Sequence, residues 1–147
     1  MSRPGLRAAA LGLALAGIGV AGYLTIVHYT GLHPVCMGGG GGCERVQASD
    51  QSELLGVPVA LFGLLAYLVL LGAAVVRTEL ARTMAAMTAL VGFGFSAYLT
   101  YRELFSIDAI CPWCVCSAVI MTLLAIVMTA RLLRVPSDHR GAIPYVG

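Results

Sequence analysis

The sequence has very little charge. Only 11% of its 147 residues are charged, whereas a soluble domain carries roughly 25%. The chain has no lysine and no asparagine, and its nine basic residues form no run suited to binding nucleic acid. These scarcities count against a soluble domain and against a nucleic-acid-binding protein. Apolar residues, in contrast, are abundant. Hydrophobic residues make up 59% of the chain, and the charges fall between long apolar runs, as in integral membrane proteins.

Four apolar segments approach the length of about 20 residues that a membrane-crossing helix needs. They cover residues 8–27, 57–76, 83–100 and 111–130. Because backbone polar groups must be hydrogen-bonded inside the hydrocarbon, we expect an all-α, integral membrane four-helix bundle. It would form one domain over residues 1–135, followed by a tail at 136–147. The first apolar run is longer than the core of a signal peptide and lacks a small-x-small cleavage site, so we expect it to be retained.

The arginines predict an orientation in the membrane. Seven of them lie at the N-terminus, between the second and third segments, and in the tail, whereas the other connections hold only Arg45 and Arg102. Because positive residues stay on the cytoplasmic side, we expect a multi-pass protein of the cell membrane with both termini in the cytoplasm. The connections 28–56 and 101–110 then face the extracytoplasmic side. The first would form a cap segment with a short amphipathic helix between Glu44 and Leu55.

The five cysteines give the main chemical signal. They are Cys36, Cys43, Cys111, Cys114 and Cys116. Four of them form two close pairs, 36/43 and 111/114, and both pairs are predicted to lie on the extracytoplasmic side. Because that side is oxidising, disulfide chemistry is favoured over metal binding. Cys116 lies on another helix face, and we expect it to behave as a small buried hydrophobic side chain.

The second pair is a C-x-x-C motif, Cys111-Pro112-Trp113-Cys114, at the start of a predicted helix. Residues three apart share a helix face, so the two sulfur atoms can form a bond. The partial positive charge of a helix N-terminus stabilises a thiolate. A structural disulfide would add little stability because it would close a very small loop. The motif therefore indicates a redox-active dithiol.

The first pair is separated by Met37 and five glycines, a stretch that we do not expect to form a stable helix or strand. Such a tether would leave both sulfur atoms mobile, which suits a shuttle that carries electrons to the C-x-x-C by thiol–disulfide exchange. The alternative is a static disulfide that closes a loop. Taken alone, the pair fits both interpretations equally; a C-x-x-C on the same side favours the shuttle.

A dithiol at the mouth of a helix bundle can be reached laterally by a lipid-soluble acceptor. A quinone accepts two electrons and two protons, which matches the output of one dithiol. The aromatic candidates for contact with its ring are Trp113, Phe93 and Tyr98, with Phe95 and Tyr101 nearby. The alternative is an ordinary belt of interfacial aromatic residues.

In order and spacing, these motifs resemble the bacterial branch of the vitamin K epoxide reductase family over about residues 10–130. The motifs are the pair Cys36 and Cys43, the run Cys43-Glu-Arg-Val46 with Ser49 after it, Gly56-Val57-Pro58 opening the second segment, and the C-x-x-C opening the fourth. The resemblance implies a four-helix bundle around a quinone of the menaquinone or ubiquinone type. Animal members hold the quinone with an asparagine, which this chain lacks, and have a tyrosine where Ala118 stands.

The resemblance also implies roles for individual residues. Cys36 would meet a DsbA-like partner of the thioredoxin fold, Cys43 would exchange with Cys111, and Cys114 would face the quinone. Ser49 would support the site from the cap. The implied activity is quinone-dependent oxidation of a protein dithiol, which supports disulfide bond formation. The tail is too short for the fused thioredoxin-like domain of some bacterial members, so the partner would be a separate chain.

Three alternatives lead to different functions. A DsbB-type quinone reductase carries its C-x-x-C in the first outer loop rather than at the fourth span. A small membrane metal-ion carrier using cysteine pairs would need cysteines on both sides or at mid-membrane. His28 and His33 match no closed zinc pattern with the cysteines, so we expect no metal site. The third alternative is a structural membrane subunit with inert disulfides.

Overall fold

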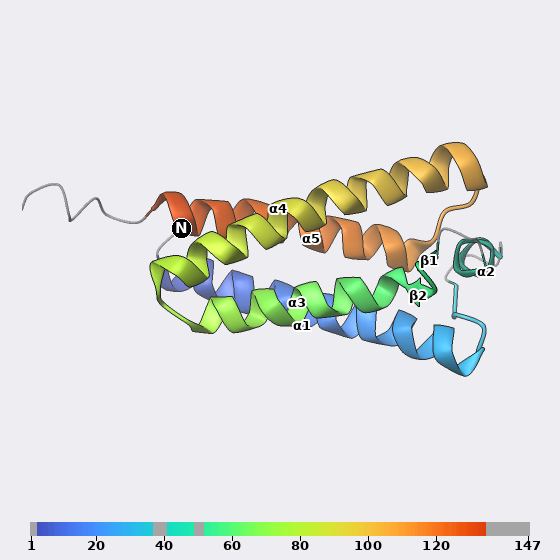
Figure 1. Ribbon diagram of the computed structural model, residues 1–147, viewed down its shortest axis with the longest axis horizontal. Coiled ribbons are helices and arrows are strands. Elements are labelled where there is room, and N and C mark those ends of the chain that lie inside the picture. The colour runs from blue at the N-terminus through green and yellow to red at the C-terminus, as the bar shows by residue number, and fades with distance from the viewer. Residues whose placement is uncertain (1–2, 37–40, 49–51, 135–147) are drawn as a thin grey trace, which may run out of the picture.

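The computed structural model describes residues 3–36, 41–48 and 52–134. Its long helices are α1 (Arg3–Thr30), α3 (Val59–Val75), α4 (Glu79–Arg102) and α5 (Pro112–Leu133). They run along one common axis (Figure 1), which confirms the predicted all-α four-helix bundle. The predictions for Ser49 and for the tail at 136–147 lie outside the described residues.

The lengths and surfaces of these helices suit a membrane. Three of them, α1, α4 and α5, are long and apolar enough to cross one. The fourth, α3, is apolar and has 17 residues, the lower limit of the usual range of about 17–25. Large apolar side chains such as Leu15, Ile26 and Leu123 point outward and are exposed. A surface of this kind is compatible with lipid rather than with water.

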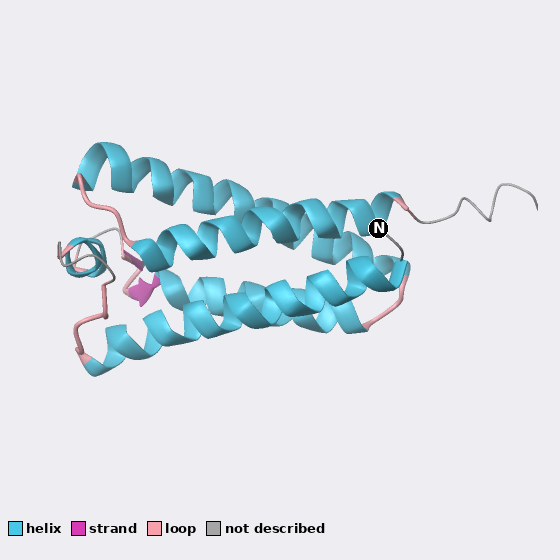
Figure 2. Cartoon of the chain, turned by 180° about the vertical axis from the view of Figure 1, so that it is seen from behind, coloured by secondary structure: helices cyan, strands magenta, loops and turns pink. Residues whose placement is uncertain are grey.

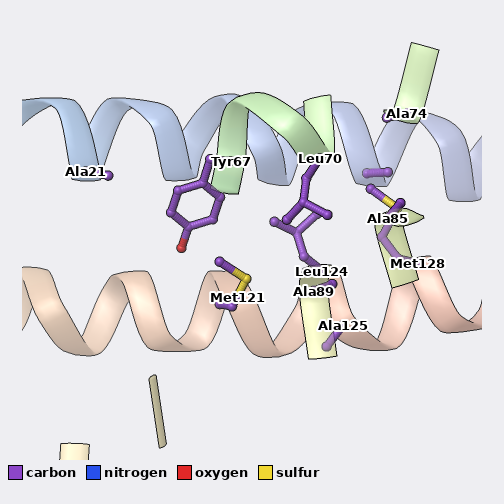
Figure 3. Close-up of a cluster of buried hydrophobic side chains, with 11 residues drawn as sticks. Ala21, Tyr67, Leu70, Ala74, Ala85, Ala89, Met121, Leu124, Ala125 and Met128 are labelled. Carbon is purple, nitrogen blue, oxygen red and sulfur yellow. The ribbon is translucent and has the colours of Figure 1, made fainter. Parts of the chain in front are cut away.

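Small residues dominate the interior of the bundle. The chain packs as a ring in which α1 contacts α3 and α5, while α4 contacts α5 and α3. The buried alanines of the four long helices are Ala10, Ala14, Ala21, Ala74, Ala85, Ala86, Ala89 and Ala125. Small side chains let helix backbones approach closely, and van der Waals packing of this kind holds membrane helices together. In the centre, Tyr67 and Leu70 of α3 meet Met121, Leu124 and Met128 of α5 (Figure 3).

One end of the bundle carries the remaining elements, and we call it the cap end. They are α2 (Gly42–Gln47) and an antiparallel hairpin of β1 (Glu53–Leu54) and β2 (Val57–Pro58). Figure 2 shows the N-terminus and the α3–α4 connection at the opposite end. The predicted short helix of the cap is present as α2, but it begins two residues before Glu44 and ends at Gln47, and residues 53–58 form a hairpin instead of continuing it. Its turn residues Leu55 and Gly56 have φ of 57° and 79°, the positive values that a type I′ turn needs.

The connection between α4 and α5 is shorter than expected. The sequence predicted that the third helix ends at residue 100, but α4 continues to Arg102 and passes into a π-helical segment, η1 (Glu103–Ile107). Asp108 ends this segment in the left-handed conformation, with φ of 49°. Short π-helical stretches are rare and occur frequently at functional sites. Here the segment places Glu103 beside the start of α5.

Candidate active site

The four paired cysteines lie together at the cap end. Cys43 and Cys111 are both fully buried and belong to one cluster with Val46 and Ala109. Cys36, Trp113 and Cys114 pack against that cluster. Cys36 and Cys43 are joined by a disulfide, whereas Cys111 and Cys114 are free thiols. The fold therefore brings two pairs that are far apart in the sequence to the same place.

Access to the first pair is asymmetric. Cys36 is half-buried, and the neighbouring Val35 side chain is 70% exposed. Cys43 is 0% exposed and is the second residue of α2, so it lies on a helix rather than on the expected mobile tether. Its N–H donates to Cys36 Sγ at 3.2 Å. Cys36 can thus be approached from outside the protein, while Cys43 faces the cluster that contains Cys111.

Trp113 fixes the loop that precedes Cys36. Its indole N–H donates to the carbonyl of Val35 at 2.9 Å, and the Val35 N–H donates to the Tyr23 hydroxyl at 3.0 Å. The rings of Tyr23 and Trp113 lie 4.8 Å apart between centroids. The sequence predicted a quinone contact for Trp113, but its polar atom is engaged by the loop. Trp113 thereby couples the position of Cys36 to that of the C-x-x-C.

Gly42 allows α2 to lie directly against the segment before Cys111. A Cβ atom on Gly42 would come within 2.5 Å of the carbonyl oxygen of Ile110. No real side chain is tolerated at that distance unless the backbone shifts. The glycine run therefore has a packing role at this position, because it permits the close approach that buries Cys43 beside Cys111.

We expect Gly42→Ala to push α2 away from the backbone of Ile110 and to slow thiol–disulfide exchange between the two cysteine pairs about tenfold or more. The added methyl group overpacks the contact with Ile110, an effect that typically costs about 1–3 kcal/mol. The measurement is stopped-flow electron transfer from the reduced 36/43 pair to the 111/114 pair. Gly12→Ala is the matched control, because a Cβ on Gly12 meets no atom within 4 Å. An unchanged exchange rate in Gly42→Ala would show that this contact does not position the pairs.

The C-x-x-C begins α5 as the sequence predicted. Cys111 is the N-cap residue and Pro112 occupies the first turn. A hydrogen bond from the Cys114 thiol lowers the pKa of Cys111, and this effect exceeds the opposing effect of burial. Hydrogen bonds from the backbone N–H groups of Trp113 and Cys114 act in the same direction. Cys111 is therefore the member of the pair that is prepared to act as a thiolate, the reactive form in thiol–disulfide exchange.

Sequence reasoning missed Glu103. Its side chain is only 6% exposed, and it is one of two buried polar residues that the described part of the chain contains. The backbone N–H of Cys111 and the thiol of Cys114 both lie in hydrogen-bond contact with its carboxylate. The available signal was an acidic residue at the end of an apolar segment, since ionisable residues at membrane depth usually have a function.

A cavity of about 570 Å³ lies between the central core and the cap end. All four long helices line it, and Cys114, Glu103 and Val46 border it from the cap end. This volume lies within the range of about 300–1,000 Å³ that is usual for small-molecule sites. Its lining is mostly apolar and includes the rings of Phe62 and Phe95. The cavity can therefore hold a flat, apolar ring compound next to the Cys114 sulfur.

Two hydroxyl groups give the cavity polar atoms. Tyr67 on α3 donates to the backbone carbonyl of Ser117 at 2.8 Å, and its oxygen lies 2.9 Å from the Ser117 hydroxyl. Both residues line the cavity. Ser117 is three residues after Cys114, so the two share one face of α5. A ring compound beside Cys114 would thus have hydroxyl groups within the same cavity for its oxygen atoms.

Two predicted quinone contacts lie elsewhere. Phe93 and Tyr98 on α4 are 41% and 54% exposed, and neither lines the cavity; Phe95 of the same helix does. Cys116 is exposed rather than buried as expected, because it faces away from Cys114 on α5. His28 pairs with Glu53 at 3.3 Å and His33 with Glu44 at 3.1 Å. Within residues 3–36, 41–48 and 52–134, no three His, Cys, Asp or Glu side chains are arranged so that they could hold a metal ion.

The chain matches a known protein family. The family model for the vitamin K epoxide reductase family matches residues 8–129, a range that contains α3, α4 and the cap and all but the outermost residues of α1 and α5. No curated protein sequence matches the chain. The matched range includes both cysteine pairs and Glu103.

Proposed function

Because the chain belongs to the vitamin K epoxide reductase family, we propose that it oxidises the dithiol of an extracytoplasmic DsbA-like partner and reduces a membrane quinone. The observation that carries this proposal is the single cluster at the cap end. It packs Cys43 against Cys111, while Cys114 borders the cavity. This arrangement supports an electron path from outside the protein to the interior of the membrane.

The first transfer occurs at the half-buried Cys36. A thiolate of the partner attacks Cys36 Sγ, breaks the Cys36–Cys43 bond and forms a mixed disulfide. The second thiol of the partner then releases Cys36, so the partner leaves oxidised and the loop pair is reduced. The burial of Cys43 supports this order, because an outside thiolate reaches Cys36 first.

The second transfer occurs inside the cluster. When the C-x-x-C is oxidised, the Cys43 thiolate attacks Cys111 Sγ and breaks the Cys111–Cys114 bond. Cys36 then closes the loop disulfide again, which leaves Cys111 and Cys114 as thiols. The lowered pKa of Cys111 supports its role as the leaving group when Cys36 attacks Cys43 and breaks the Cys43–Cys111 bond, since a more acidic thiol leaves faster. The described structure corresponds to the product of this step, with a loop disulfide and two free thiols.

The cavity fits a quinone by size and by lining. Phe62 and Phe95 would contact the ring, and the Ser117 hydroxyl, which Tyr67 contacts, would donate to one of its oxygen atoms in place of the missing asparagine. When bound, a quinone supplies a two-electron, two-proton acceptor. Cys114 borders the space where the ring would lie, and it delivers the electrons as its bond to Cys111 forms.

We also propose that the cap end faces the extracytoplasmic side and that both termini are cytoplasmic. The arginine distribution supports this orientation. At the opposite end, Arg7 and Arg131 donate to the carbonyls of Val75 and Ala74 at 3.4 and 3.2 Å. These contacts satisfy carbonyl groups that the C-terminus of α3 leaves free. The arginines therefore stabilise this end of the bundle as well as indicating its side of the membrane.

Reconstitution tests the proposed function. The purified protein in lipid nanodiscs receives a reduced thioredoxin-fold protein and either a menaquinone or a ubiquinone analogue. We expect one quinol to form for each disulfide formed in the partner. Absorbance measures the quinol. Uptake of metal ions into vesicles without quinol formation would instead favour a metal-ion carrier. Failure of both reactions would support a structural subunit with inert disulfides.

A further inference from the structure

Glu103 has no role in the electron path described so far, yet it is buried between the cysteine cluster and the cavity. It lies on η1, which packs against α4 and α2. Its carboxylate has two partners, the N–H of Cys111 and the thiol of Cys114. The backbone contact holds the carboxylate in place, and the thiol contact offers it a proton. Glu103 also borders the cavity, so it can pass a proton that it accepts to a compound bound there.

We propose that Glu103 is a catalytic residue that takes the proton of Cys114 when the C-x-x-C is oxidised and passes it on toward the quinone. This inference rests on the proposed function and adds the path of one proton to it. In the balanced step, Cys114 gives its proton to Glu103, Cys111 loses its own proton, and a bond forms between the two sulfurs. Two electrons and two protons leave the pair, so dithiol and quinone become disulfide and quinol. One of the two protons is the one returned by Glu103.

Electrostatics require this sharing of a proton. A Cys114 thiolate and a Glu103 carboxylate in direct contact would place two negative charges side by side in a site largely closed to water, where repulsion is weakly screened. Ionisation of Cys114 is therefore coupled to protonation of Glu103. The Cys114 thiol can also turn toward Cys111. The same hydrogen atom thus either stabilises the Cys111 thiolate or moves to Glu103.

Other charged groups on the neighbouring elements do not replace Glu103. They are Arg102 on α4, Glu44 and Arg45 on α2, and Asp108 at the end of η1. The side chains of Glu44, Arg45 and Asp108 are exposed. Within the described part of the chain, no salt bridge to Glu103 occurs. Glu103 is thus the carboxylate that contacts the C-x-x-C directly.

The test measures the alkylation of Cys114 by iodoacetamide against pH, with no quinone and no partner present. Cys111→Ala serves as the background, and mass spectrometry identifies the alkylated residue. Only the thiolate reacts. Between the two apparent pKa values of the pair, one proton is shared by Cys114 and Glu103. The fraction of Cys114 that is thiolate does not change with pH in this range, so the alkylation rate shows a plateau there. With Glu103→Gln, the amide can keep the hydrogen bonds but cannot take the proton. The plateau should vanish, and the rate should rise about tenfold per pH unit up to a single pKa.

The control is Glu79→Gln, which removes an exposed carboxylate at the other end of α4 and should keep the plateau. Glu103→Asp should restore a plateau, because it retains a carboxylate. A rate that rises tenfold per pH unit without a plateau in the parent itself would overturn the proposal, even if Glu103→Gln does not fold. In quinone turnover, Glu103→Gln should lose about a hundredfold in rate, the lower end of what a positioned general base contributes. If the parent shows the plateau but reduces no quinone, the proposed function fails while the shared proton stands.

Discussion

Replacing Cys114 by alanine is expected to abolish quinone-dependent oxidation of a protein dithiol, with a loss of about a thousandfold or more, as for other residues that take part in bond making. Without Cys114, the C-x-x-C cannot form its disulfide and no sulfur atom borders the cavity from α5 at that position. The measurement is quinol formation by the reconstituted variant. Retention of full activity would exclude the proposed electron path.

A double variant gives a second, chemical result. With both Cys36→Ala and Cys114→Ala, Cys111 remains beside Cys43 in the cluster, and neither thiol that could resolve a Cys43–Cys111 disulfide is left. We expect a Cys43–Cys111 disulfide to accumulate and to be found by mass spectrometry after mild oxidation. Cys116→Ala is the matched control, because Cys116 lies two residues further on α5 and is exposed. That variant should keep normal turnover. If no Cys43–Cys111 species forms, the two pairs do not exchange directly.

The bundle could be predicted from the sequence because length and apolarity alone determine which segments cross a bilayer. The sequence could not predict which face of each helix points into the bundle. Helix α4 is apolar on most faces, so periodicity does not distinguish Phe95, which lines the cavity, from Phe93 and Tyr98, which do not. In a soluble protein, the polar face of a helix would have given this information. In a membrane, both the packed face and the lipid face are apolar.

The redox-active dithiol of the C-x-x-C could be predicted because it depends only on residues close together in the sequence. These are two cysteines three positions apart at the start of a helix. The contact between Cys43 and Cys111 joins residues far apart in the chain, and only the family resemblance implied it. Glu103 escaped because the third helix was predicted to end at residue 100, which placed this acid in a solvent-exposed loop. The π-helical continuation of α4 turns it inward instead. The hairpin at residues 53–58 was missed because two-residue strands produce no measurable alternation.

Cys36→Ala should separate the two halves of the electron path. We expect oxidation of a thioredoxin-fold partner to fall by about a hundredfold or more, because the partner loses the half-buried sulfur atom that it attacks. A small dithiol should still reduce the C-x-x-C directly, so its oxidation should stay within about threefold of the parent rate. The measurement compares quinol formation with the two substrates in the same preparation, which makes the small dithiol an internal control for folding. Equal losses with both substrates would mean that the loop pair supports the structure of the site instead of carrying electrons from the partner. Unequal losses would place Cys36 at the entrance of the path, as its exposure relative to the buried Cys43 suggests.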